Sequence, residues 1–202
     1  INRMAARALG ENGDPAAVDP LIQALFQFAP GNPSMRMNDV AIEGLVRIGR
    51  PSLQPLLSLL DGTHAAANTA ADALIAAFRE RSPTLNVSRE QVVTPEATDA
   101  LGMLGLADAL EPLLAETRAR ERSRQLNGVV ALVRLRVSAA QQRRLGRAVT
   151  ATYRTLGPDQ FELRGQRLAT MATTFDPAYF PLMFTTARDQ HAHAAVRETA
   201  LV

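Results

Sequence analysis

Residues 5–21 read AARALGENGDPAAVDPL, and their pattern is the clearest indication of the fold class. Apolar residues recur at helical spacing on both sides of a central break, so each half predicts an amphipathic helix. Gly13 is expected to end the first helix in the left-handed conformation. Asp14 is a natural cap for the second helix, and Pro15 suits its first position. The stretch therefore predicts two helices joined by a tight turn.

The same order of leucine, glycine and proline occurs three times in the chain. The copies are Leu9, Gly13 and Pro20, then Leu45, Gly49 and Pro55, then Leu101, Gly105 and Pro112. A proline in a helix interior costs about 3 kcal/mol, so three matches at one place predict a position early in the second helix. We interpret Gly10, Gly13 and Gly49 as helix terminators. A repeat of this kind predicts an array of stacked helix pairs.

The runs Ala5 to Gly10 and Asp14 to Leu21 resemble a HEAT repeat of the bacterial, phycocyanobilin-lyase-like type. The resemblance implies an all-α fold, an α-solenoid superhelix of stacked antiparallel helix pairs of the HEAT/armadillo kind. We expect one array over 1–202 with about five pairs and an irregular repeat at 61–94. Within it, the second helix expected at 82–94 is missing, shortened or replaced by a loop. Both ends read as helix interiors, which predicts truncation within a longer array.

Composition favours packed helices over sheets. Hydrophobic residues make up 47% of the chain and charged residues 21%, aromatic residues only 4%, and tryptophan is absent. No run approaches the roughly 20 apolar residues that span a bilayer, and no signal peptide opens the sequence. The sequence therefore predicts a soluble segment, either cytoplasmic or periplasmic. The absence of cysteine excludes disulfides, thiolate metal sites and cysteine nucleophiles.

Charge is unevenly distributed along the chain. All 22 basic residues are arginine, and 118–154 holds ten of them with a single acid, Glu121. The stretch 90–117 before it holds six acids and no base. The basic stretch is interpreted as a patch for an acidic partner or a phosphate backbone, or else as charge that the acidic stretch neutralises. The candidate partner-binding residues are Arg118, Arg120, Arg122, Arg124, Arg143, Arg144 and Arg147.

The sequence predicts no catalytic residue, metal or cofactor. His191 and His193 are two positions apart, so on a regular helix they point away from each other and cannot share an ion. His64 is the one further imidazole. No nucleophile elbow, phosphate-binding glycine loop or dinucleotide fingerprint is present.

Four of the nine aromatic residues lie within ten positions near the C-terminal end. They are Phe175, Tyr179, Phe180 and Phe184. Such a cluster forms either part of the core or a contact surface for an additional repeat or subunit.

These observations favour a non-catalytic scaffold or adaptor that presents an extended helical surface for protein–protein interaction. Its partner would be another protein with an acidic patch, or further repeats of the same chain. The alternative is a nucleic-acid-binding or enzymatic HEAT-like module, similar to DNA glycosylases or bilin lyases, that uses 118–154. The near absence of stacking aromatics in that stretch argues against single-strand recognition.

Overall fold

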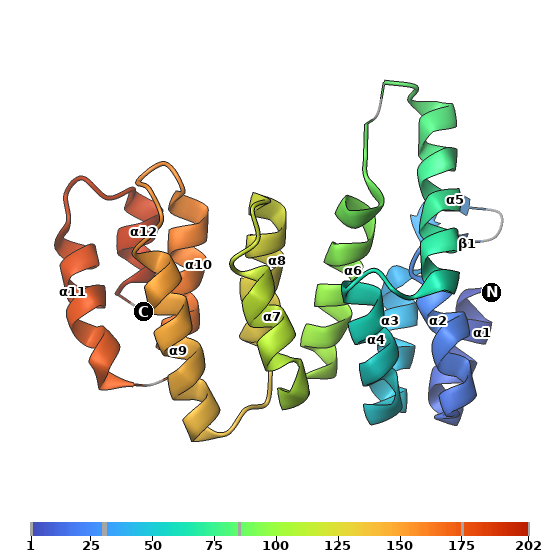
Figure 1. Cartoon of the computed structure of the whole chain (residues 1–202), viewed down its shortest axis with the longest axis horizontal. Coiled ribbons are helices and arrows are strands. Elements are labelled where there is room, and N and C mark those ends of the chain that lie inside the picture. The colour runs from blue at the N-terminus through green and yellow to red at the C-terminus, as the bar shows by residue number, and fades with distance from the viewer. Residues whose placement is uncertain (1, 30–31, 85, 175, 202) are drawn as a thin grey trace. The chain divides into compact units, whose positions relative to one another are not determined.

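The computed structural model describes residues 2–29, 32–84, 86–174 and 176–201. The chain divides into two compact units, Ile1–Leu106 and Ala107–Val202. Both units are built from packed helix pairs (Figure 1), which confirms the predicted all-α, HEAT-like fold class. The single array over 1–202 stays a prediction.

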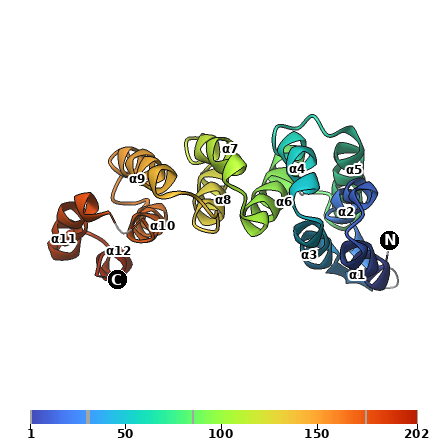
Figure 2. The ribbon, with the colours of Figure 1, turned by 90° about the horizontal axis from the view of Figure 1, so that it is seen from below.

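Unit 1 carries its helices in two packed rows. In one row α1 packs on α3 and α3 packs on α6; in the other, α2 packs on α4 and α5. Figure 2 shows α1 beside α3. Fully buried leucines such as Leu21, Leu45 and Leu101 fill the space between the rows. The elements are α1 (Arg3–Asn12), a 3-10 turn (Pro15–Ala17), α2 (Val18–Ala24), β1 (Phe28–Ala29), β2 (Asn32–Arg36), α3 (Asn38–Ile48), a 3-10 turn (Arg50–Ser52), α4 (Leu53–Leu60), α5 (Ala65–Arg81) and α6 (Arg89–Leu104).

Unit 2 repeats this arrangement. The helices α8, α10 and α12 form one row, and α7 packs on α8 and α9, α9 on α10, and α11 on α12. Leu113, Leu132 and Leu163 are fully buried between them. The elements are a 3-10 turn (Ala107–Ala109), α7 (Leu110–Glu116), α8 (Arg122–Leu132), α9 (Ala139–Tyr153), α10 (Phe161–Ala172), a 3-10 turn (Pro177–Tyr179), α11 (Phe180–Arg188) and α12 (Ala194–Thr199).

Glycine ends the first helix of each predicted motif. Gly13, Gly49 and Gly105 have φ values of 68°, 79° and 70°, a region that favours glycine, so this prediction is confirmed. The interpretation of Gly10 as a terminator is wrong, because Gly10 lies inside α1. A Cβ atom at Gly10 would overlap the Cα of Gly44 on α3. Gly10 is therefore small so that the two helix backbones can touch.

The interior prolines lie early in their helices, as predicted. Pro20, Pro55 and Pro112 are each the third residue of an α-helix, and a three-residue 3-10 turn precedes each of these helices. Pro181 is the second residue of α11 and also follows a 3-10 turn. Near a helix N-terminus the missing proline N–H has little effect, since the first N–H groups have no partner inside the helix.

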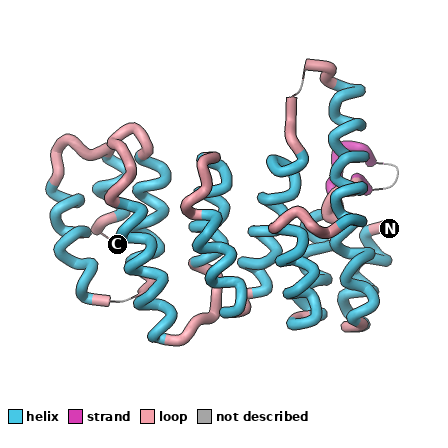
Figure 3. Tube along the Cα trace, in the orientation of Figure 1, coloured by secondary structure: helices cyan, strands magenta, loops and turns pink. Residues whose placement is uncertain are grey.

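The irregular stretch after α5 is shorter than 82–94, because α6 already begins at Arg89. Ser88 and Gln91 form a capping box that starts α6, and the helix then runs through Pro95. A second departure from the expected pattern is the antiparallel hairpin of β1 and β2 (Figure 3). Phe28 of this hairpin packs edge-on against Phe78 of α5, with 5.9 Å between the ring centroids.

Candidate interaction surface

The seven candidate arginines all lie in unit 2, on three neighbouring elements. Arg118 and Arg120 occupy the turn between α7 and α8, where they are exposed. Arg122 and Arg124 lie in the first turn of α8. The remaining three lie on α9, namely Arg143, Arg144 and Arg147.

Three of the seven arginines form ion pairs inside unit 2. Arg122 pairs with Glu162 of α10, and Arg144 pairs with Glu111 of α7 at 2.9 Å. Arg124 forms a bidentate contact with Glu116, with 2.7 Å between Nε and Oε2 and 2.6 Å between Nη2 and Oε1. This pair is largely buried, and bidentate geometry is the strongest form of an arginine–carboxylate ion pair. These three charges are already compensated.

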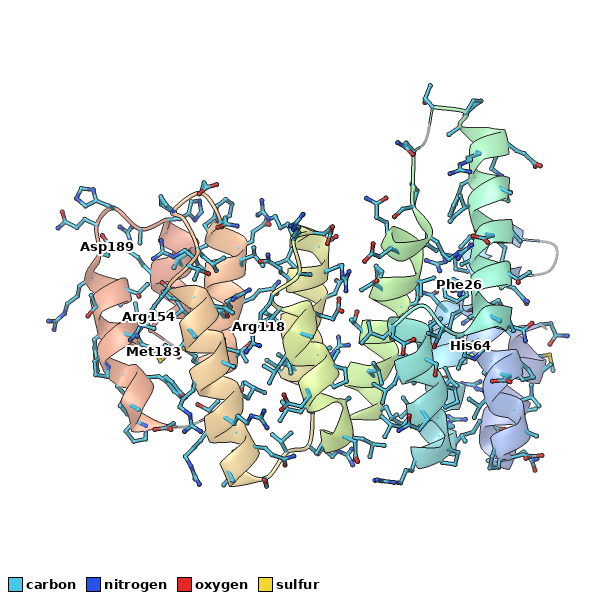
Figure 4. All side chains as sticks on the ribbon, viewed as in Figure 1. Phe26, His64, Arg118, Arg154, Met183 and Asp189 are labelled. Carbon is cyan, nitrogen blue, oxygen red and sulfur yellow. The ribbon has the colours of Figure 1, made fainter. Side chains whose placement is uncertain are left out.

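The other four candidates remain available. Arg118, Arg120, Arg143 and Arg147 form no ion pair with any described residue. Two of them continue into a stripe along α9 that also includes Thr150 and the helix-capping Arg154. Positions 143, 147, 150 and 154 follow the 3.6-residue period, so these side chains share one face of the helix. Arg154, labelled in Figure 4, is absent from the predicted set, although its spacing from Arg147 could have revealed it.

A groove of about 510 Å³ lies along this stripe. We call it the α9–α11 groove, because its walls come from α9, from α11 and from the 3-10 turn before α11. It is lined by Arg147, Thr150, Ala151, Arg154, Ala178, Tyr179, Pro181, Leu182 and Thr185.

Gly146 determines how closely these two elements approach. A Cβ atom at Gly146 would lie 2.6 Å from Cζ of Tyr179, so only glycine leaves room for the ring. The Tyr179 hydroxyl donates to the carbonyl of Arg143 at 3.3 Å. Tyr179 is only 5% exposed, and burial raises the pKa of its hydroxyl. The buried Tyr179 side chain therefore connects the turn before α11 to α9 by packing and by a hydrogen bond.

The predicted aromatic cluster divides between core and surface. Tyr179 is core, whereas Phe180 and Phe184 are 50% and 62% exposed. Phe175 lies outside the described residues. The exposed rings border a hollow of about 210 Å³, which we call the α11–α12 apolar face. It is lined by Phe180, Met183, Phe184, Ala200 and Leu201. Adjacent exposed aromatic residues of this kind mark contact surfaces.

One arginine outside the predicted set is buried. Arg167 of α10 is 1% exposed, and its Nη2 donates to the carbonyl of Thr117 at 2.9 Å. Its Nε and Nη1 have no hydrogen-bond partner among the described residues. Burial lowers the pKa of Arg167 to about 10, so the side chain is still charged at neutral pH. Among the described residues of unit 2, the hydrogen-bond acceptors of this buried positive charge are neutral, namely the Thr117 carbonyl and Gln125 Oε1.

Unit 1 contains a buried carboxylate. Glu96 of α6 contacts Arg36 at 2.8 Å and accepts a hydrogen bond from Asn38 at 3.3 Å. Burial raises the pKa of Glu96, and the nearby Arg36 charge opposes that rise. Arg36 also donates to the carbonyl of Leu25 at 2.9 Å. This cluster ties the hairpin to α6.

Two of the three histidines act as helix caps in the structure. His64 Nδ1 accepts from the N–H of Ala67 at the start of α5, and His193 Nδ1 accepts from the N–H of Ala195 at the start of α12. The His193 ring also stacks on Phe161, with centroids 4.0 Å apart. Both side chains thus have a structural role at a helix start.

Comparison with known proteins supports the repeat architecture. The family model described as PBS lyase HEAT-like repeat matches residues 1–27, which cover α1, the following 3-10 turn and α2. No curated protein matches the sequence. Over the described parts of the chain, no helix is both long and apolar enough to cross a membrane. The family match thus shows a PBS lyase HEAT-like repeat at residues 1–27, and the paired helices of both units have a HEAT-like all-α fold.

Proposed function

We propose that this chain is a non-catalytic scaffold or adaptor that presents a helical surface to another protein. HEAT-like repeats are generally protein-interaction scaffolds, and stacked repeats offer extended rigid surfaces for that purpose. The observation that carries the proposal is the α11–α12 apolar face. Phe180 and Phe184 expose half or more of their surface beside an apolar hollow. Aromatic side chains dominate interface energetics, so a partner that covers these rings gains substantial burial energy.

Affinity purification of the chain from its source cells tests this proposal. The wild type is compared with the double variant Phe180→Ser/Phe184→Asp and with Arg136→Glu, an exposed change in the α8–α9 loop. We expect one protein to co-purify with the wild type and with Arg136→Glu, and to be lost with the double variant. Circular dichroism confirms that each variant is folded. Retention of no protein by the wild type, or equal retention by the double variant, would overturn the proposal.

The alternative, a nucleic-acid-binding or enzymatic module that uses 118–154, draws support from the unpaired arginines of that stretch. The ion pairs of Arg122, Arg124 and Arg144 weaken it, because those charges are already compensated. Binding to duplex DNA that falls steeply with rising salt would support this alternative. No affinity for a duplex at low salt would exclude its duplex-binding form.

A further inference from the structure

The two arginines that line the α9–α11 groove are uncompensated. Arg147 and Arg154 are exposed, and neither forms an ion pair or a side-chain hydrogen bond with any residue that the structure describes. The described lining contains no aspartate or glutamate. The groove therefore concentrates positive charge, which favours an anionic ligand.

The spacing of these arginines limits the form of the ligand. They are seven residues apart on one helix, which places them on the same face and about 10 Å apart along the axis. A segment in the extended polyproline II conformation has three residues per turn and rises about 3.1 Å per residue, so two acidic residues three positions apart lie on one face, about 9 Å from each other. A guanidinium presents a planar fork of donors that suits a carboxylate.

The other polar groups of the groove already use their hydrogens. The Thr150 hydroxyl donates to the Gly146 carbonyl and the Thr185 hydroxyl donates to the Pro181 carbonyl, each at 2.8 Å. The Tyr179 hydroxyl donates to the Arg143 carbonyl. The two guanidinium groups are thus left as the donors available to a ligand among the lining side chains.

Apolar side chains make up much of the remaining wall. Ala151 comes from α9, and Ala178, Pro181 and Leu182 come from α11 and the turn before it. Such a wall suits the aliphatic side chains of a peptide and gives nothing to a phosphate backbone, which is recognised chiefly by cations and polar donors. The neighbouring Arg144 is paired with Glu111 and adds little to any electrostatic surface for a duplex.

We propose that the α9–α11 groove binds an extended acidic segment of a partner protein. Two carboxylates three positions apart pair with Arg147 and Arg154, and the residues between them pack against Ala151 and Leu182. This inference depends on the proposed scaffold function in one respect, because the acidic segment belongs to a partner protein. It assigns this groove as a second contact site, lined by residues other than those of the α11–α12 apolar face.

A synthetic peptide provides a direct probe. A fluorescein-labelled nonapeptide of sequence GSDLVDLGS is titrated with the chain at an ionic strength of about 0.15 M, where the Debye length is about 8 Å, and binding is followed by fluorescence anisotropy. A peptide with both aspartates replaced by asparagine is the matched control. We expect the acidic peptide to bind at least about tenfold more tightly, since one charge-assisted contact accounts for a factor of that size.

Charge reversal then locates the site. Arg147→Glu and Arg154→Glu are each expected to weaken peptide binding about tenfold, and the double variant is expected to reduce it to the level of the asparagine peptide. Arg136→Glu changes the net charge equally, but position 136 does not line the groove. We expect it to alter binding less than about twofold, because an exposed charge outside the groove lining does not pair with the peptide and is screened by salt.

Several outcomes would overturn the groove proposal. One is that the acidic peptide and the asparagine peptide bind equally well. Another is that Arg154→Glu leaves peptide binding unchanged, and a third is that Arg136→Glu weakens binding as much as Arg154→Glu does. A short DNA duplex that binds more tightly and displaces the peptide would assign the groove to nucleic acid instead. Phe180→Ser/Phe184→Asp should bind the peptide normally. Failure of the peptide assay while the wild type still retains its partner would therefore reject the groove alone. Retention of no partner by the wild type, with intact peptide binding, would reject only the scaffold interface.

Discussion

The ring of Tyr179 packs directly against the backbone of Gly146. Its position fixes the turn before α11 against α9 and so shapes the α9–α11 groove. A glycine inside a helix destabilises it by about 0.5–1 kcal/mol relative to alanine. At position 146 this disadvantage is offset by the close packing that glycine allows.

Gly146→Ala is expected to lower the free energy of unfolding despite its better helix propensity. The new methyl group would lie 2.6 Å from Cζ of Tyr179, and such overpacking costs about 1–3 kcal/mol. Urea unfolding followed by circular dichroism measures the change. Gly165→Ala is the matched control, because a Cβ there meets its nearest atom, Thr199 Oγ1, at an ordinary 3.6 Å. That variant should be more stable than wild type, and stabilisation by both substitutions would contradict the packing argument.

Arg167→Met is expected to raise the free energy of unfolding by about 1–2 kcal/mol. It removes a buried charge that lacks a carboxylate partner and keeps most of the side-chain volume, and this outweighs the lost hydrogen bond to Thr117. Thermal and urea unfolding both report the change. Arg167→Ala should instead destabilise by about 2–4 kcal/mol, because it leaves a cavity. Equal destabilisation by Arg167→Met and Arg167→Ala would contradict this prediction, because it would mean that the groups around Arg167 stabilise its charge.

The α11–α12 apolar face should cause the isolated chain to self-associate at high concentration. Phe180 and Phe184 gain burial when two such faces meet. Sedimentation velocity over a concentration series measures this, and Phe180→Ser/Phe184→Asp should shift the chain to monomer. A wild-type chain that stays monomeric at the highest concentration would show that these rings do not drive association.

Glu96 and Asp39 should contribute to the pH dependence of stability with opposite signs. The folded-state pKa of Glu96 is raised, chiefly by burial, so its contribution to stability falls as pH rises from the ordinary glutamate value through that raised pKa. The pKa of Asp39 is lowered, chiefly by the hydrogen bond from Arg3, so its contribution is lost as pH falls through that lowered value.

The two effects are separated by comparing Glu96→Gln and Asp39→Asn with wild type in urea unfolding between pH 3 and pH 7. The stability difference, wild type minus variant, should decrease with rising pH for Glu96→Gln and increase for Asp39→Asn. A difference that stays constant across this range for either variant would contradict the assignment at that residue.

The features that were predicted correctly from sequence depend on nearby residues alone. Gly13, Gly49 and Gly105 end helices because their own backbone conformation requires it, and Pro20 and Pro55 lie early in helices for the same local reason. The start of α6 was harder to place, since Pro95 resembles a helix opening. The capping box of Ser88 and Gln91 determines the actual start.

The features that escaped prediction depend on contacts between distant residues. The role of Gly10 is set by Gly44 on another helix, and the partner of Arg122 is Glu162, which is 40 positions away. Nothing local distinguishes Arg122, which is paired, from Arg120, for which the described residues provide no ion-pair partner. The sequence could therefore indicate a basic surface, but not which of its arginines remain available.

The turn chemistry between paired helices has a consequence for how such a protein can change. Asp14 caps the N–H of Ala16, and Asp176 caps that of Ala178 in the same way, so each cap is completed within its own pair. A pair that carries its own cap can be duplicated, deleted or exchanged with another pair without losing those bonds. When a whole helix pair is inserted or deleted, only the apolar surfaces of the newly adjacent pairs must therefore pack against each other.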